Sequence, residues 1–253
     1  MANNEGRKKN FLREPFNSMD QEEVLRRVEE EVKREMMGRE GSHDFHHVER
    51  VVALALKLAE EEGADPFIVH LSALVHDLYD RKEHPDDYLE KLAEFLEGVG
   101  VSGALQERVL RIVEEVSYRG GSLRPASAEG RVVQDADRLD ALGAIGVARA
   151  FSYGGSMGRP LYNPEVISIP GEEDPHHPQR FTEMSLEDRL KGVEEMKGDP
   201  STIFHFYEKL LLLKDYMNTM TGRKIAERRT EFMVRFLEEF FGEWVEDCGA
   251  EDY

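Results

Sequence analysis

The run RVVQDADRLDALGAIGVARAF, residues 131–151, combines an apolar helical pattern with a carboxylate in a core position. Residues four apart lie above one another on a helix, so Val133 and Asp137 share one face. Small residues on either side of Asp137 would let another helix approach closely. We therefore predict one long central helix over residues 131–151. Its core face continues through Ala141, Ala144 and Ala148.

A second polar group lies at the edge of an apolar face in LSALVHDLYD, residues 71–80. The pair His76-Asp77 is surrounded there by leucine and valine. Asp65 followed by Pro66 is a typical N-cap and first-turn pair, which predicts a helix from Pro66 through Leu78. A buried carboxylate is costly unless it is paired or bound to a metal.

A third helix carries an imidazole toward the core. In SHDFHHVERV, residues 42–51, His47 precedes Val51 by four residues and Ala55 by eight, so it falls on the buried stripe. Three separate helices thus offer imidazole or carboxylate groups from core-facing positions. Two histidines and two aspartates suit Mn, Ni, Co, Fe, Zn or Mg, and the sequence does not select among these metals.

The remaining pattern is that of an all-α protein. Apolar spacing predicts further helices over residues 20–38, 48–63, 85–98, 105–116, 201–220 and 222–245. Residues 154–178 hold five of the ten prolines and four glycines, which predicts a long loop of the lid or binding type. We expect a flexible N-terminal arm over residues 1–17. Residues 18–253 should form a single domain on which the C-terminal helices pack.

Composition limits the partners. The 253 residues include 33 Lys and Arg against 52 Asp and Glu, a net charge of −19 that disfavours binding to duplex nucleic acid. An anionic substrate would need a local cation, which a metal would supply. One cysteine, Cys248, permits no internal disulfide, and no apolar run is long enough for a membrane span. These features predict a cytoplasmic protein.

The order His47, His76-Asp77, Asp137 resembles that of the HD-domain metal-dependent phosphohydrolases. The flanking segments, with FYEKLLLLKDYMNTMTGRKIAERRTEFM at 206–233, are similar to the bacterial single-domain subfamily that includes nucleotide pyrophosphohydrolases. The resemblance covers residues 20–244. It implies an HD-type helical bundle in which these four residues hold one divalent metal. Two-metal relatives add histidines before the last aspartate, whereas residues 78–136 contain only His84.

The same resemblance implies hydrolysis of nucleoside triphosphates to a monophosphate and pyrophosphate. No Rossmann or P-loop glycine pattern is present, so the nucleotide rests on the resemblance alone. A 5′-nucleotidase acting on monophosphates would use the same metal ligands. A non-catalytic module that senses nucleotide is the alternative from a different class, and the oligomeric state (monomer or homodimer) stays open.

Candidate catalytic and substrate-binding residues surround these ligands in the sequence. Asp80, one helical turn after His76, is a candidate to orient water or take its proton, with a surface salt bridge to Lys82 as the alternative. Arg50 follows His47 by three residues and is a candidate for binding phosphate. Asp140 is expected to orient a histidine.

Four further residues are candidates for binding substrate. They are His43, Lys82, Lys209 and Lys214. His43 could equally cap a helix, and lysines on helices are usually solvated. The pair His176-His177 lies in the Pro-rich loop and is not expected to bind the metal.

Overall fold

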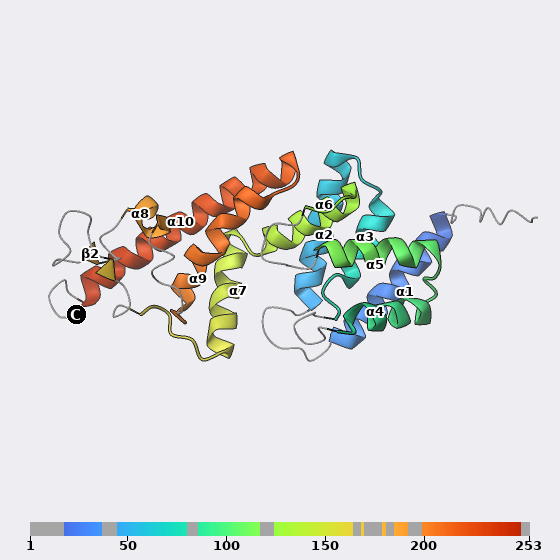
Figure 1. Cartoon of the computed structure of the whole chain (residues 1–253), viewed down its shortest axis with the longest axis horizontal. Helices are drawn as coiled ribbons and strands as arrows, with labels where there is room; N and C mark the ends of the chain where they lie inside the picture. Colours follow the sequence, from blue (N-terminus) through green and yellow to red (C-terminus); the bar gives the residue numbers. More distant parts are fainter. Residues whose placement is uncertain are drawn as a thin grey trace, which may run out of the picture.

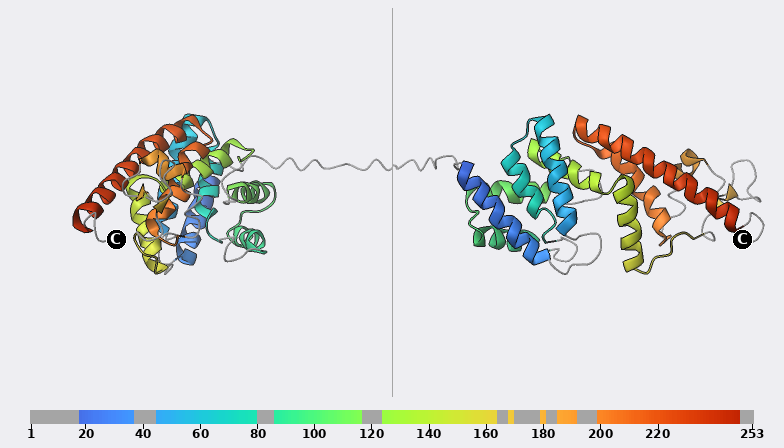
Figure 2. Two further views of the ribbon diagram at one scale, coloured as in Figure 1. Left: turned by 60° about the vertical axis from the view of Figure 1, so that its left-hand side comes forward. Right: turned by 180° about the vertical axis from the view of Figure 1, so that it is seen from behind.

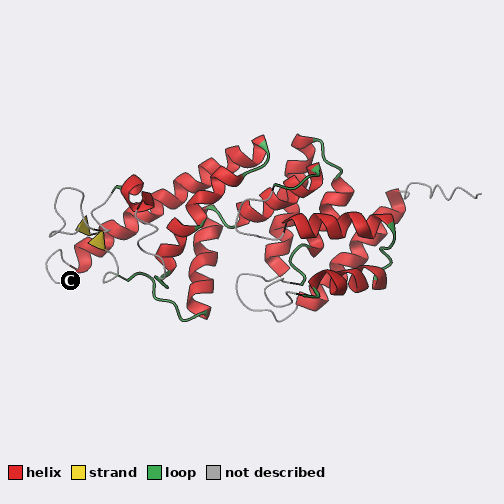
Figure 3. Ribbon diagram, in the orientation of Figure 1, coloured by secondary structure: helices red, strands yellow, loops and turns green. Residues whose placement is uncertain are grey.

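A computed structural model describes residues 18–36, 45–79, 86–116, 124–163, 168–169, 179–180, 185–191 and 199–248. The regular elements of these parts are helices, apart from one antiparallel pair of two-residue strands (Figure 3). The predicted all-α class is confirmed. In chain order the elements are α1 (Ser18–Met36), α2 (Phe45–Glu62), α3 (Pro66–Val75), α4 (Tyr88–Gly98), α5 (Ala104–Val116), α6 (Ala128–Asp140), α7 (Gly143–Ser156), β1 (Ser168–Ile169), β2 (Gln179–Arg180), α8 (Leu186–Lys191), α9 (Thr202–Glu208), the 3-10 helix η4 (Leu210–Tyr216) and α10 (Met220–Cys248).

Helix α6 joins the two ends of an elongated molecule. Helices α1 to α5 gather at one end, and α7 to α10 lie at the other (Figure 1; Figure 2). α6 packs on α2, α3 and α5 and also contacts α10 and α7. Because α6 touches both groups of helices, a residue on it can meet side chains from either end. No helix of the described parts combines the length and the apolarity that a bilayer crossing requires.

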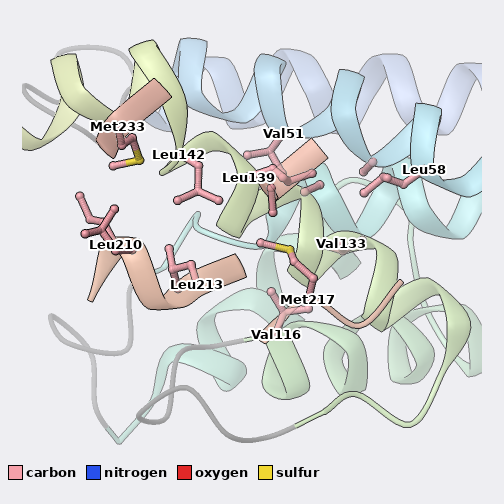
Figure 4. Close-up of a cluster of buried hydrophobic side chains, with 14 of the residues drawn as sticks. Val51, Leu58, Val116, Val133, Leu139, Leu142, Leu210, Leu213, Met217 and Met233 are labelled. Atoms are coloured by element: carbon pink, nitrogen blue, oxygen red, sulfur yellow. The ribbon is translucent and has the colours of Figure 1, made fainter. Parts of the chain in front are cut away.

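One hydrophobic core runs along this axis. It includes Val51 of α2, Leu139 of α6, Leu213 of η4 and Met233 of α10 (Figure 4). A second cluster, around Leu71, fills the space between α1, α3, α4 and α5. Burial of these side chains holds the helices that carry the polar groups described below.

The predicted helix over residues 131–151 is wrong, because two helices occupy this run. α6 ends at Asp140, and α7 begins at Gly143, whose φ of +74° is a left-handed conformation that glycine adopts without strain. This left-handed conformation changes the direction of the chain between α6 and α7. Ala144 and Ala148 consequently lie exposed on α7 and do not share the core face of Asp137.

Other element boundaries also differ from the prediction, three of them with consequences for the fold. α3 ends at Val75, before the predicted end at residue 78. The predicted helix over 201–220 breaks at Lys209, where φ is −139° and the chain continues as a 3-10 helix. α7 extends to Ser156, so the first residues of the predicted Pro/Gly-rich loop are helical. Much of that loop, residues 164–167 and 170–178, lies outside the described residues, as does the predicted arm over residues 1–17.

A buried carboxylate ties α6 to the start of α10. Asp135 is 0% exposed and accepts hydrogen bonds from the backbone nitrogens of Asn218 and Thr219. The Asn218 amide and the Thr219 hydroxyl donate to it as well, at 2.8 and 2.7 Å. Asp135 therefore fixes α10 beside the helix that carries Asp137.

Candidate metal centre

His47 lies on the buried stripe of α2, as predicted, and its side chain is 0% exposed. Its Nδ1 lies 2.8 Å from Oδ2 of Asp140, which as a carboxylate oxygen can only accept. Nδ1 therefore carries the proton, and the lone pair of this imidazole is on Nε2. That nitrogen faces Asp137, whose Oδ1 lies 3.5 Å away.

His76 is the C-cap of α3, and the end of the helix determines its tautomer. Its Nδ1 donates to the carbonyl of Ala73 at 2.8 Å, so in the neutral imidazole the lone pair is again on Nε2. This Nε2 is buried and makes no hydrogen bond to the residues that the structure describes. Asp137 Oδ1 lies 3.7 Å from it. A buried nitrogen of this kind is satisfied when a metal ion occupies the space beside it.

Asp137 completes a three-residue cluster. Its side chain is 39% exposed, whereas the imidazole of His76 is 4% exposed, so the cluster opens to solvent on the Asp137 side. One atom from each of His47, His76 and Asp137 lies within 4.8 Å of the other two. Metal–ligand bonds of about 2.0–2.2 Å place neighbouring ligand atoms about 3.0–3.5 Å apart. The residues therefore fit a divalent ion with little movement.

In the metal-free protein, a proton on His76 balances the negative charge of Asp137. Burial acts to lower the pKa of His76, but the nearby Asp137 carboxylate outweighs it and raises that pKa to about 9. Desolvation acts to raise the pKa of Asp137, yet His76 and His47 hold it well below its usual range. Burial lowers the pKa of His47.

Asp77, the fourth predicted ligand, follows His76 in the turn after α3 and is half-buried. Its charge acts on His76, but its carboxylate is outside the compact group of His47, His76 and Asp137. The structure thus brings together three of the four predicted ligands. The role of Asp77 as a ligand stays a prediction.

Asp140 contacts His47 on the side of the ring away from Asp137. The expected contact between Asp140 and a histidine is present. Its side chain is 2% exposed and also accepts from Arg50 Nε at 2.8 Å and Nη2 at 3.0 Å. Arg149 Nη1 donates to the same carboxylate at 2.9 Å. Burial acts to raise the pKa of Asp140, but His47 and Arg50 outweigh it and hold that pKa at about 2. A carboxylate behind a ligating histidine fixes the ring orientation and raises its basicity.

The other predicted site residues have mixed outcomes. Arg50 is beside the cluster, where it pairs with Asp140, so its contact with phosphate stays a prediction. Asp80, Lys82 and His43 lie outside the described residues. Lys214 is exposed and lines a separate pocket on α10, and Lys209 caps α9. No contact that the structure describes joins either lysine to His47, His76 or Asp137, so their substrate contacts remain unsupported predictions.

Arg149 contacts the centre through Asp140, and the sequence analysis did not identify it. It is the one charged residue in the small and apolar run GAIGVARAF, residues 143–151. Its side chain is 17% exposed. That isolated charge was an available signal, but its contact with Asp140 depends on the turn at Gly143, which the predicted straight helix omitted.

Known proteins share this architecture. The HD domain family matches residues 44–142. The YpgQ protein of Bacillus subtilis strain 168 is 41% identical over 203 residues, which cover 77% of this chain and 81% of that protein. A crystal structure of Bacillus subtilis YpgQ in complex with ADP matches 90% of this chain and 100% of its own, with 33% identity and a TM-score of 0.64. An HD-superfamily hydrolase from Bacillus thuringiensis matches 88% of this chain and 98% of its own, with 35% identity and a TM-score of 0.64.

A helical bundle that presents two histidines and an aspartate at one partly open point has the architecture of a metal-dependent hydrolase. The fold, the cluster and these relatives all indicate the same class of protein. The chain belongs to the HD-domain family and is a metal-dependent phosphohydrolase.

Proposed function

We propose that this phosphohydrolase converts nucleoside triphosphates to monophosphates and pyrophosphate. The observation that carries the proposal is the His47, His76 and Asp137 cluster in a chain similar along most of its length to a protein crystallised with ADP. ADP is a nucleotide with a phosphoanhydride bond, so this relative supports a nucleotide substrate with more than one phosphate.

The side chains have separate tasks in this scheme. His47, His76 and Asp137, with Asp77, would hold one divalent ion, which supplies Lewis-acid polarisation and lowers the pKa of bound water. Asp140 holds His47 in the tautomer that presents Nε2. Asp80 is the proposed acceptor of the proton from the attacking water. Attack at the α-phosphorus separates pyrophosphate from the monophosphate.

The experiment is turnover by metal-stripped protein supplied with Mn, Ni, Co or Mg, on dNTPs, NTPs and NMPs. Pyrophosphate and orthophosphate are measured separately. Pyrophosphate from triphosphates is the expected result. Orthophosphate from monophosphates would instead identify a nucleotidase, and a tight complex that stays unhydrolysed for hours would identify a sensor.

Asp77→Ala tests the proposed ligand set. It should abolish both metal retention and turnover, because the substitution removes one of four ligands. Retained turnover by metal-free Asp77→Ala protein would contradict the scheme.

A further inference from the structure

A group of arginines surrounds Asp140, next to the metal centre. Arg50 of α2 makes two hydrogen bonds to this carboxylate, and Arg149 of α7 makes one. Arg149 Nη1 and His47 Nδ1 bind the same oxygen, Oδ2. A single oxygen atom of Asp140 therefore links Arg149 to the imidazole of His47.

A third arginine arrives from α10. Arg229 donates to the carbonyl of Leu139, the residue before Asp140. Burial lowers the pKa of Arg229, and the charge of Asp140 acts in the opposite direction. Arg229 packs closely on Gly143, where an added Cβ would lie 3.1 Å from Arg229 Cγ. Two helices thus bring guanidinium groups into contact with Asp140, and a third places one beside it, at Leu139.

The positive charges of these arginines offset the negative charge of the carboxylates at the metal centre. Asp77, Asp137 and Asp140 carry three negative charges, and a divalent ion leaves the group with a net charge of minus one. Such a group would repel a polyphosphate, as would the rest of a chain with net charge −19. The positive charges of Arg50, Arg149 and Arg229 make the net charge of this group positive. Among the described residues, these arginines make the surroundings of the metal attractive to an anion.

Arg149 is placed to meet such an anion. Its side chain is 17% exposed, and its charge acts on both Asp137 and His47. Asp137 is on the open side of the cluster. A guanidinium has five N–H donors in a planar fork, so one arginine can bind a buried carboxylate and an incoming phosphate together. Asp140 supplies the fixed anchor for that arrangement.

We propose that Arg149, anchored by Asp140, binds the phosphate groups that leave as pyrophosphate, with Arg50 and Arg229 adding positive charge. The identification of these groups as part of a nucleoside triphosphate rests on the proposed function. The binding site itself requires only a diphosphate next to the metal. Arg149 is thus a substrate-binding residue contributed by a helix that holds no metal ligand.

The test is calorimetric titration of pyrophosphate into protein saturated with Mn, for wild type, Arg149→Met, Arg149→Lys and Arg108→Met. A charge-assisted hydrogen bond predicts about tenfold or greater weakening in Arg149→Met. Arg149→Lys should recover part of the lost pyrophosphate affinity, because lysine keeps the positive charge but lacks the planar set of N–H donors. Arg108→Met is the matched control, since Arg108 pairs with Glu129, outside the centre, at 3.1 Å.

Manganese affinity is measured separately in the same variants. It should change little in Arg149→Met, because Arg50 retains both of its bonds to Asp140. Loss of manganese binding in Arg149→Met would overturn the inference and make Arg149 a positioning residue for His47. Equal pyrophosphate affinity in Arg149→Met and wild type would also overturn it.

The two proposals fail in distinguishable ways. Wild-type protein that binds pyrophosphate through Arg149 but releases none from triphosphates would contradict the proposed function and leave this inference standing. Wild-type protein that releases pyrophosphate, with unchanged pyrophosphate binding in Arg149→Met, would contradict the inference alone.

Discussion

The orientation of His47 depends on Asp140, a single buried carboxylate. Asp140→Asn leaves one accepting oxygen where His47, Arg50 and Arg149 all donate. An amide N–H that faces His47 would favour the tautomer with the proton on Nε2, and Nε2 could then no longer bind the metal. We expect metal affinity to fall by about 10–100-fold, measured by calorimetric titration of manganese.

Asp135→Asn is the control for this substitution. Asp135 is equally buried on the same helix, but it accepts from Asn218 and Thr219 and not from a metal ligand. The control should lower stability and leave manganese affinity close to that of wild type. An equal loss of affinity in both variants would show that Asp140 acts through the general integrity of α6.

Proton competition makes metal binding depend on pH. In the metal-free protein the pKa of His76 is about 9, above the ordinary 6.5, so binding at pH 7 must displace its proton. The pKa of His47 is lowered, so its imidazole is neutral at pH 7. Affinity should rise about tenfold per pH unit from pH 7 toward 9 and then level off, because one proton is released. The His76 contribution to metal-free stability has the opposite trend: it is fully present below pH 6.5 and is lost as pH rises through about 9.

Titration in buffers of different ionisation enthalpy counts the released protons directly. One proton per metal at pH 7.5 is expected from His76. Affinity that stays constant between pH 7 and 8.5 would show that His76 carries no proton before the metal binds.

Single residues of the site divide into those visible in sequence and those that require the tertiary structure. His47, His76 and Asp137 were identifiable because a polar group on an apolar helical stripe needs a reason to be there. Arg149 and Arg229 were not, since their closeness to Asp140 depends on how α7 and α10 pack. Lys209 and Lys214 were chosen by their place in the sequence, and their roles as substrate-binding residues stay predictions.

At the scale of elements, the turn between α6 and α7 was the largest error of the sequence analysis. Apolar and small residues continue through the break, so periodicity alone predicts one helix. The deciding feature is the left-handed backbone conformation at Gly143; a glycine inside a helical pattern signals a possible break, and apolar periodicity does not register it. Most other helices were predicted to within a few residues, because caps such as Asp65 and the apolar spacing agree there.

Two glycines of α7 test this description of the turn. In Gly146→Ala a Cβ would lie 2.2 Å from the carbonyl oxygen of Ala141, so backbone must move, at a cost of about 1–3 kcal/mol or more. Gly155 is exposed on the same helix with nothing within 4 Å of its Cβ position, so Gly155→Ala should stabilise by about 0.5–1 kcal/mol. Urea denaturation of the metal-free variants measures both. Equal effects of the two substitutions would contradict the close contact at Gly146.

At the scale of the whole molecule, one core spans the described helices from α2 to α10. Val51 and Phe241 belong to the same buried cluster, and Asp135 joins α6 to α10. We therefore predict that residues 18–253 unfold as one cooperative unit, with a single calorimetric transition. Two separated transitions, one for each end of the molecule, would contradict the single domain.

The central claim concerns the whole enzyme, namely that one divalent ion at His47, His76 and Asp137 makes it hydrolyse triphosphates. The direct measurement is titration of metal into stripped protein while pyrophosphate release from a triphosphate is followed. Activity should rise linearly and saturate at one ion per chain, with Asp137→Asn inactive at every metal concentration. Saturation at two ions per chain, or full turnover by Asp137→Asn, would contradict the account.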